Sequence, residues 1–289
     1  MAIGSMRRTQ SPPEPVYPVS QSTPRRVDVA RRKRAQPLPW RWPGYIPALV
    51  LGVFLIVFWQ ILSTSGAVAS SQLPQPMVVL EAFWRSLRDG VLLSYTATTI
   101  EESLVGFLLG TVVALPLAYV IARNRTLARM VEPYVAASQA MPAVALAPLL
   151  VLWLGYGLLP VAVLCALIVF FPMTVNTVLG LRTLDRDIVD AARVGGADRW
   201  SLLRYIEMPL AMPSVLAGMR ASLTYSITGA VVGEFVLSDQ GLGGLMTIAR
   251  GNFDVPLVFA TLLMLGLLAS AMYGVGRLIE RRLSYLEDE

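Results

Sequence analysis

The chain has 289 residues, of which 55% are hydrophobic and only 15% are charged, and its mean hydropathy is +0.60. Soluble globular proteins carry about 25% charged residues, so this composition excludes an ordinary soluble domain and indicates an integral membrane protein. The net charge of +5 does not indicate nucleic-acid binding, because the basic residues lie in short segments between apolar runs, as they do in membrane proteins.

The N-terminal segment, residues 1–44, is rich in proline, serine, glutamine and arginine. This composition predicts a disordered basic tail that keeps the N-terminus in the cytoplasm. The membrane domain is expected to cover residues 45–282 and to begin with a span at residues 46–62. Ala67-Val68-Ala69 resembles a signal-peptidase site, but the charged leader is too long for a signal peptide, so we expect an uncleaved anchor.

Five further apolar segments are long enough to cross a bilayer. They lie at residues 104–122, 136–154, 158–177, 215–237 and 257–276. Residues 72–95 show apolar side chains at helical spacing, which predicts a short surface helix. The expected fold is therefore an all-α integral membrane protein with six transmembrane helices. With the N-terminus inside, 20 of the 24 Lys and Arg residues fall on the cytoplasmic side, so both termini, including a short tail at 283–289, are expected there.

Glycines and prolines mark special points within the spans. Gly106 and Gly110 form a small-xxx-small pair, which lets two helices approach closely. Pro142 and Pro148 interrupt the third span, and the backbone groups they free need water or neighbouring helices, which suits a helix that lines a pathway. Residues 238–255, which are rich in glycine, are expected to form a loop.

Several polar or helix-breaking positions within the spans are candidates for lining a translocation path. They are Ser138, Gln139, Pro142, Thr174, Asn176 and Glu234. Hydrogen bonds between helices explain the polar members equally well, and for Glu234 a gate or a structural hydrogen bond is favoured over contact with a solute. Glu101 and Glu102 precede the second predicted span, where a capping or interfacial role is favoured, although an intramembrane carboxylate is otherwise a functional-site candidate.

The sequence shows no catalytic constellation. It contains no histidine, which excludes a Ser-His-Asp site, and no cluster of histidine and cysteine for a metal. Its one cysteine, Cys165, cannot form an internal disulfide and is expected to pack as a small apolar residue. It also contains no Gly-x-x-x-x-Gly-Lys-Ser/Thr loop, so we do not expect the chain to bind ATP by that means.

The longest polar interval, residues 182–209, is expected to lie in the cytoplasm. Residues 187–194 predict two helical turns, and Gly195-Gly196 predicts a sharp break. Asp198 is a good N-cap for a second short helix, which Pro209 is expected to end.

An apolar stripe runs along this second short helix. Trp200, Leu203 and Ile206 recur about every three residues, as they would on one face of a helix. An exposed stripe of this kind is typical of a docking surface. The alternative is that the stripe packs back beneath the spans of the chain itself.

The same interval resembles the EAA motif of the membrane subunits of ATP-binding-cassette (ABC) importers. Asp190-Ala191-Ala192 is followed by three residues, Gly196, nine residues and Ile206-Glu207-Met208-Pro209. The family motif reads Glu-Ala-Ala, three residues, Gly, nine residues, Ile-x-Leu-Pro. Every spacing matches, and the two departures, Asp190 for Glu and Met208 for Leu, keep the chemistry.

The resemblance implies a type I ABC importer permease fold. It further implies that the loop at 182–209 forms a coupling helix in a groove of a separate cytoplasmic ABC ATPase, with Trp200, Leu203 and Ile206 as its docking face. ATP and Mg²⁺ would then belong to the ATPase, and no cofactor or metal is expected on this chain. A solute-binding protein would deliver the substrate to the outer face of the plasma membrane, and a second copy of the chain or a related permease would complete the path.

Four other short segments are similar to one branch of these permeases, which contains sulfonate, taurine, nitrate, thiamine-precursor and riboflavin permeases. They are Leu73-Pro74-Gln75-Pro76, Gly106-Phe107, Met141-Pro142-Ala143 and Gly241-Leu242-Gly243. The branch includes importers of anions and of heterocycles. Glutamates at 101 and 102, where anion importers often carry arginine, favour a heterocyclic vitamin or precursor such as riboflavin or a thiamine pyrimidine, and a sulfonate, taurine or nitrate is the alternative.

Two other classes of membrane protein are possible on composition alone. A stand-alone secondary transporter would show inverted repeats and ionisable groups at mid-membrane, and neither is evident in the sequence. A membrane-anchored scaffold without transport does not explain the prolines that interrupt the third span.

Overall fold

The computed structural model describes residues 46–69, 71–140, 142–237 and 240–285, except for the side chains of 132, 136–140, 284 and 285. These residues are almost entirely helical and include no strand. The predicted tail at 1–44 lies outside them, as does most of the predicted tail at 283–289. By its internal contacts the chain divides into residues 1–51 and 52–289.

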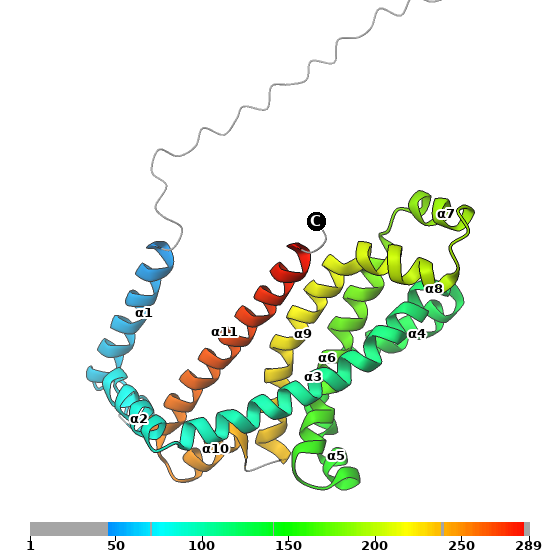
Figure 1. Ribbon diagram of the computed structural model, residues 1–289. Helices are drawn as coiled ribbons and strands as arrows, with labels where there is room; N and C mark the ends of the chain where they lie inside the picture. Colours follow the sequence, from blue (N-terminus) through cyan, green and yellow to red (C-terminus); the bar gives the residue numbers. More distant parts are fainter. Residues whose placement is uncertain (1–45, 70, 141, 238–239, 286–289) are drawn as a thin grey trace, which may run out of the picture. The chain divides into compact units, whose positions relative to one another are not determined.

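Thirteen helical elements follow one another along the described chain (Figure 1). They are α1 (Ile46–Thr64), α2 (Pro76–Arg88), α3 (Val91–Arg123), α4 (Arg125–Ala140), η1 (Ala143–Leu146), α5 (Ala147–Leu154), α6 (Leu158–Arg182), α7 (Arg186–Val194), α8 (Arg199–Leu202), η2 (Leu203–Glu207), α9 (Met208–Leu237), α10 (Gly241–Gly251) and α11 (Val255–Tyr285).

Among the described residues, five helical segments are long and apolar enough to cross a membrane. They are α1, α3, α6, the continuous segment from α8 to α9, and α11. They contain five of the six predicted spans, and the predicted surface helix is present as α2. Most of them extend beyond the predicted bounds because their ends carry polar residues that hydropathy excludes.

The third predicted span, residues 136–154, is not one continuous helix, in keeping with the interruption that Pro142 predicted. Helix α4 ends at Ala140, Pro142 has an extended backbone, and the short elements η1 and α5 follow. Proline lacks an N–H group and disfavours helical geometry in the residue before it, so the helix breaks at this point. Pro148 does not break α5, because it lies in the first turn, where the missing N–H has no partner to lose.

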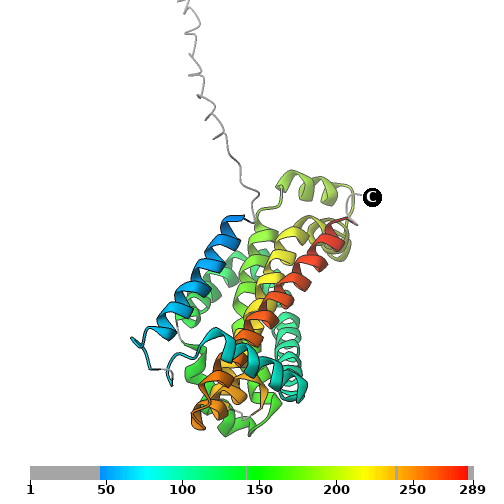
Figure 2. The ribbon, with the colours of Figure 1, turned by 90° about the vertical axis from the view of Figure 1, so that its left-hand side faces the viewer.

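Glycines allow the central helices to pack closely. Helix α6 packs against both α3 and α9, and α9 also packs against α11 (Figure 1 and Figure 2). A Cβ atom on Gly106 would lie 2.2 Å from Cβ of the buried Cys165, and one on Gly229 would lie 3.0 Å from its Cα. The close approach that the pair of Gly106 and Gly110 allows is made between α3 and α6, and α9 uses a glycine in the same way.

The glycine-rich segment at 238–255 is not the predicted loop. It contains α10, which packs against α3, α9 and α11 and buries Leu242 and Leu245. A Cβ atom on Gly243 would lie 2.7 Å from the carbonyl oxygen of Val231. The glycines therefore serve close packing, and tertiary contacts outweigh their low helix propensity.

Pro209 does not end the second short helix of the polar interval, contrary to the prediction. Helix α8 continues through the π-helical turn η2 into α9, and Pro209 is the second residue of α9. In a π turn the backbone hydrogen bonds join residues five apart instead of four. The regular α-helical hydrogen bonds are therefore already interrupted before Pro209, so the missing N–H of the proline does not end the helix. The polar interval is consequently connected to the membrane-spanning part of α9 without a break.

Candidate functional site

The polar interval forms a loop with defined ends at both of its short helices. Asp185 caps α7 by accepting a hydrogen bond from the backbone N–H of Asp187 at 3.0 Å. Gly196 has φ +88, a left-handed conformation that glycine adopts without strain. Asp198 caps α8 by accepting from the N–H of Ser201 at 3.1 Å. The predicted helix, glycine break and N-cap are all confirmed.

The hydrogen bonds at the α8 cap also set the charge state of its acceptor. Asp198 is fully exposed, and the hydrogen bonds from Ser201 lower the pKa of its carboxyl group. Because these bonds favour the charged form, Asp198 is ionised at neutral pH and also interacts favourably with the N-terminal end of the helix.

The predicted apolar stripe is divided between surface and interior. Trp200 is 64% exposed, whereas Leu203 and Ile206 are half-buried, and Leu202, which precedes Leu203, is buried. One side of α8 and η2 is therefore turned toward the interior of the chain, whereas Trp200 faces outward and remains available for contact.

The two most exposed apolar side chains of this loop were not predicted. Val194, at the end of α7, is 91% exposed, and Tyr205, in η2, is 71% exposed. Tyr205 was missed because the expected three-residue spacing assumes a regular helix, and the π turn rotates the following side chains. The turn at Gly195-Gly196 exposes Val194, and the adjacent glycines were a usable signal for it.

An ion pair connects the loop to α3. Arg123, the last residue of α3, pairs with Glu207, the last residue of η2, whose side chain is buried. Asp190 of the EAA-like motif pairs with Arg193 at 2.9 Å on the exposed side of α7. Only the first pair joins distant segments, and a pair between residues 84 positions apart has no signal in local sequence.

The residues predicted to line a path do not form one group. Thr174 is buried in α6, and the side-chain amide of Asn176 donates to the carbonyl oxygen of Pro172 at 2.7 Å. A Cβ atom on Gly218 of α9 would lie 2.8 Å from Cβ of Asn176, so Asn176 packs at a helix contact. Ser138 and Gln139 belong to α4, but their side chains are outside the described residues, and Pro142 is exposed.

Two carboxyl groups meet inside the protein. Glu102 is 1% exposed and Glu234 is fully buried, and their side chains interact directly. Glu102 lies well inside α3, which begins at Val91, so the expected capping role was wrong: α3 starts about three turns before the apolar segment that hydropathy detects. The buried position of Glu102 also removes it as a group facing a solute in this conformation.

Glu234 joins α9 to α10. Its Oε2 atom accepts a hydrogen bond from the N–H of Gly243 at 2.6 Å, and Thr99 of α3 accepts from the N–H of Leu242 at 2.8 Å. The first turn of a helix has free N–H groups that such acceptors satisfy. Glu234 is thus a structural hydrogen-bond acceptor that fixes α10 near the start of α3 and the end of α9, one of the two roles that the sequence favoured.

Comparisons with known proteins agree on the family. The model of the family described as binding-protein-dependent transport system inner membrane component matches residues 106–285. The riboflavin transport system permease protein RibX of Chloroflexus aurantiacus is 41% identical, and the match covers 84% of this chain and 91% of that protein. The formylaminopyrimidine transport permease protein ThiX of Halalkalibacterium halodurans is 32% identical, with 75% of this chain and 86% of that protein covered.

A solved structure shares the fold. The chain is similar to a subunit of the MetNI methionine ABC transporter in an inward-facing conformation, with a TM-score of 0.57, 19% identity, and coverage of 72% of this chain and 97% of that chain. Permeases of this kind are transport subunits in the plasma membrane that work with an ATPase and a solute-binding protein. The chain belongs to the family of binding-protein-dependent transport system inner membrane components and is an ABC importer permease with the type I fold.

Proposed function

We propose that this permease forms the translocation path for a small organic solute and docks on its ATPase through residues 182–209. The observation that carries the docking assignment is the exposure of Val194, Trp200 and Tyr205 on a loop with capped helices. Burying a large apolar side chain stabilises a contact by about 1.5–3 kcal/mol. Three such side chains on a preorganised loop are suited to a groove on a partner protein.

In this proposal ATP and Mg²⁺ bind to the partner ATPase, and the present chain supplies no cofactor or metal site. Both termini lie in the cytoplasm, on the same side as the loop, in keeping with the distribution of basic residues. The loop is continuous with α9 through η2 and is joined to α3 by the pair of Arg123 and Glu207. A displacement of the loop by the ATPase would therefore reach two spans directly.

Two copies of the chain are proposed to enclose the path. The broken segment from α4 to α5 would contribute to it, since interrupted helices at membrane depth occur where backbone groups face other protein segments or a water-filled cavity. Cross-linking of the purified full-length chain, followed by mass measurement, tests this arrangement. A mass equal to one copy, or to one copy with a different permease, would contradict the homodimer.

The proposed substrate is a heterocyclic vitamin or precursor, with riboflavin as the first compound to test. The support is the similarity to RibX and ThiX. Glu102 gives no support for a heterocycle, because it is buried against Glu234. An aliphatic sulfonate is the second candidate, since a permease of Bacillus subtilis named for aliphatic sulfonates is 28% identical over 83% of this chain.

Co-purification with the ATPase tests the docking assignment. Trp200→Glu places a charge on the exposed docking side chain, and Trp84→Glu makes the same change at a 52% exposed position in α2, which is expected on the opposite side of the membrane. We expect Trp200→Glu and Leu203→Asp to reduce the amount of ATPase recovered, and Trp84→Glu to leave it unchanged. Unchanged recovery with both loop variants would refute the assignment of the loop.

Uptake into proteoliposomes tests the substrate. The permease is reconstituted with its ATPase and binding protein, and ATP-dependent accumulation of riboflavin is compared with that of an alkanesulfonate. Accumulation of riboflavin alone supports the proposal, and accumulation of the sulfonate alone contradicts it. A complex with ATPase activity that depends on the binding protein shows that the reconstitution itself has succeeded.

A further inference from the structure

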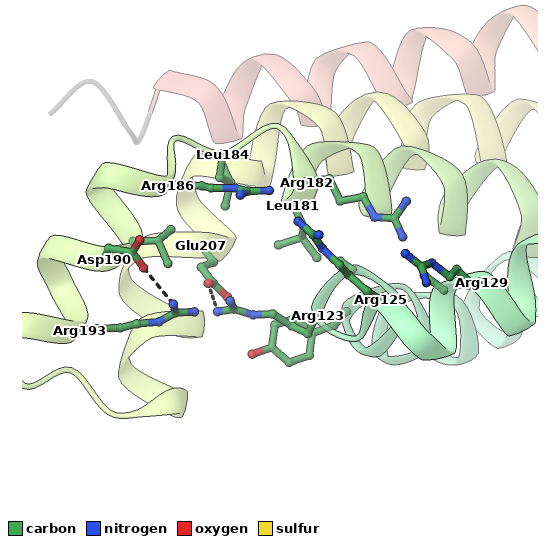
Figure 3. Close-up of a pocket in the computed structure, with 14 residues that line it drawn as sticks. Arg123, Arg125, Arg129, Leu181, Arg182, Leu184, Arg186, Asp190, Arg193 and Glu207 are labelled. Atoms are coloured by element: carbon green, nitrogen blue, oxygen red, sulfur yellow. Dashed lines mark hydrogen bonds and ion pairs between the residues drawn. The ribbon is translucent and has the colours of Figure 1, made fainter.

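An open pocket with a strongly basic lining lies beside the coupling loop. It has a volume of about 630 Å³ and is formed by residues from the end of α3, the start of α4, the end of α6, and α7 (Figure 3). Its described lining contains two acidic side chains, Asp190 and Glu207, and six arginines. The arginines are Arg123, Arg125, Arg129, Arg182, Arg186 and Arg193.

The two acidic side chains are already engaged. Glu207 pairs with Arg123, and Asp190 pairs with Arg193 (Figure 3). Arg125 of α4 and Arg186 of α7 extend from different helices into the space between them (Figure 3). Cations that share one cavity repel each other, and an anion placed among them removes this repulsion.

The backbone adds to the positive potential. Arg125 and Arg186 are the first residues of α4 and α7, and the N-terminal end of a helix carries a partial positive charge. Asn124 accepts hydrogen bonds from the N–H groups of Thr126 and Leu127, which satisfies the first turn of α4 with a neutral side chain. Asp185 caps α7 and Asp187 lies in its first turn, and neither of these acidic residues lines the pocket.

We propose that this pocket binds a phosphate group. Guanidinium groups form paired, charge-assisted hydrogen bonds with phosphate oxygens, and the pocket offers them from two helices at once. The volume admits a phosphate with a substituent, such as a lipid headgroup or a small soluble phosphate ester. The charge distribution along the chain places the pocket at the cytoplasmic face, where both anionic headgroups and soluble phosphates occur.

Occupation of the pocket would affect the coupling loop. A phosphate held by both Arg125 and Arg186 would connect α4 to α7, and α7 carries Asp190 of the EAA-like motif. The site is therefore a place where an anion stabilises one position of the loop relative to the spans. The binding itself does not depend on the substrate or on the docking assignment proposed above.

The test uses the full-length chain in nanodiscs of phosphatidylcholine, which has no net charge. The thermal midpoint is measured after adding inorganic phosphate, with sodium chloride at equal ionic strength as the reference, and again in discs containing phosphatidylglycerol. Arg125→Gln with Arg186→Gln removes two of the pocket charges. Arg277→Gln with Arg282→Gln removes two exposed charges from the cytoplasmic end of α11, outside the pocket.

We expect phosphate or phosphatidylglycerol to raise the thermal midpoint of the unaltered chain and of the α11 double variant. The pocket double variant should need about tenfold more of the anion for half the effect, as for the loss of hydrogen bonds to a charged group. A response to phosphatidylglycerol alone identifies a lipid headgroup, and a response to inorganic phosphate identifies a soluble ligand. Equal responses of the two double variants, or no response of the unaltered chain to either anion, would overturn the proposal.

Discussion

Replacing Gly106 by alanine tests the central helix contact of this permease. The new Cβ atom would lie 2.2 Å from Cβ of Cys165 and 2.7 Å from the carbonyl oxygen of Ala162. Carbon atoms in contact are about 3.5–4.0 Å apart. Helices α3 and α6 must therefore move apart by about 1.5 Å, because the obstacle is the backbone of α6 and the first atom of a side chain, neither of which can rotate away.

The expected cost follows from this overlap. Extra atoms forced into a well-packed interior usually destabilise a protein by about 1–3 kcal/mol. The better helix propensity of alanine offsets at most about 1 kcal/mol of this. The separation also opens the contact along the neighbouring Gly110, whose own Cβ would lie 2.8 Å from the carbonyl oxygen of Ala166, so the net effect is a clear loss of stability.

The assay is thermal unfolding of the purified full-length chain in detergent, followed by tryptophan fluorescence. Gly266→Ala in α11 is the matched control, because nothing lies within 4 Å of a Cβ atom at that position. We expect a lower midpoint for Gly106→Ala, an unchanged or slightly higher one for Gly266→Ala, and partial recovery when Cys165→Gly is added to Gly106→Ala. Equal midpoints for the two alanine variants would show that α3 and α6 do not approach as described.

Three further predictions concern the loop and α10. Arg123→Gln leaves the buried carboxyl of Glu207 without its partner. It should destabilise the chain by about 3 kcal/mol or less, since breaking a buried pair costs about 3–5 kcal/mol and Arg123 is partly exposed. In a thermal-unfolding double-mutant cycle, adding Glu207→Gln should recover much of the loss, and simple additivity would argue against the pair. Asp198→Ala should weaken ATPase co-purification while Asp198→Asn retains it, because asparagine also caps helices well. The pKa of Asp198 lies below its ordinary value of 3.8, so the ionised cap contributes above that pH and is lost only as the pH falls through the lowered pKa. A change in co-purification near neutral pH could not come from this group. Gly243→Ala should destabilise the contact of α10 with α9, whereas Gly251→Ala should not, because a Cβ atom at that position meets nothing within 4 Å. Protease resistance of α10 measures the difference, and equal resistance of the two variants would contradict the packing of α10.

Local signals in the sequence were sufficient for much of the fold. Runs of apolar residues predicted the helices that can span a membrane, because burial of apolar side chains in lipid depends on composition along one segment. The break at Gly196 and the cap at Asp198 were predictable for a similar reason, since each depends on the residue's own backbone preference or on a hydrogen bond three residues away. The spacing from Asp190 to Pro209 was enough to indicate the family.

Features that depend on residues far apart in the chain were decided by the tertiary structure. From sequence alone the glycines of α10 indicate a loop, and only the packing against Val231 and the carboxyl of Glu234 shows why glycine is needed there. Glu102 likewise resembles a helix cap in the sequence, and the structure places it well inside α3, which begins at Val91. The arginines of the phosphate pocket come from the junction of α3 with α4 and from the ends of α6 and α7, which the helix packing alone brings together. Hydropathy and spacing report the preferences of neighbouring residues, whereas these contacts arise from the paths of separate helices, and their energies exist only once the helices have assembled.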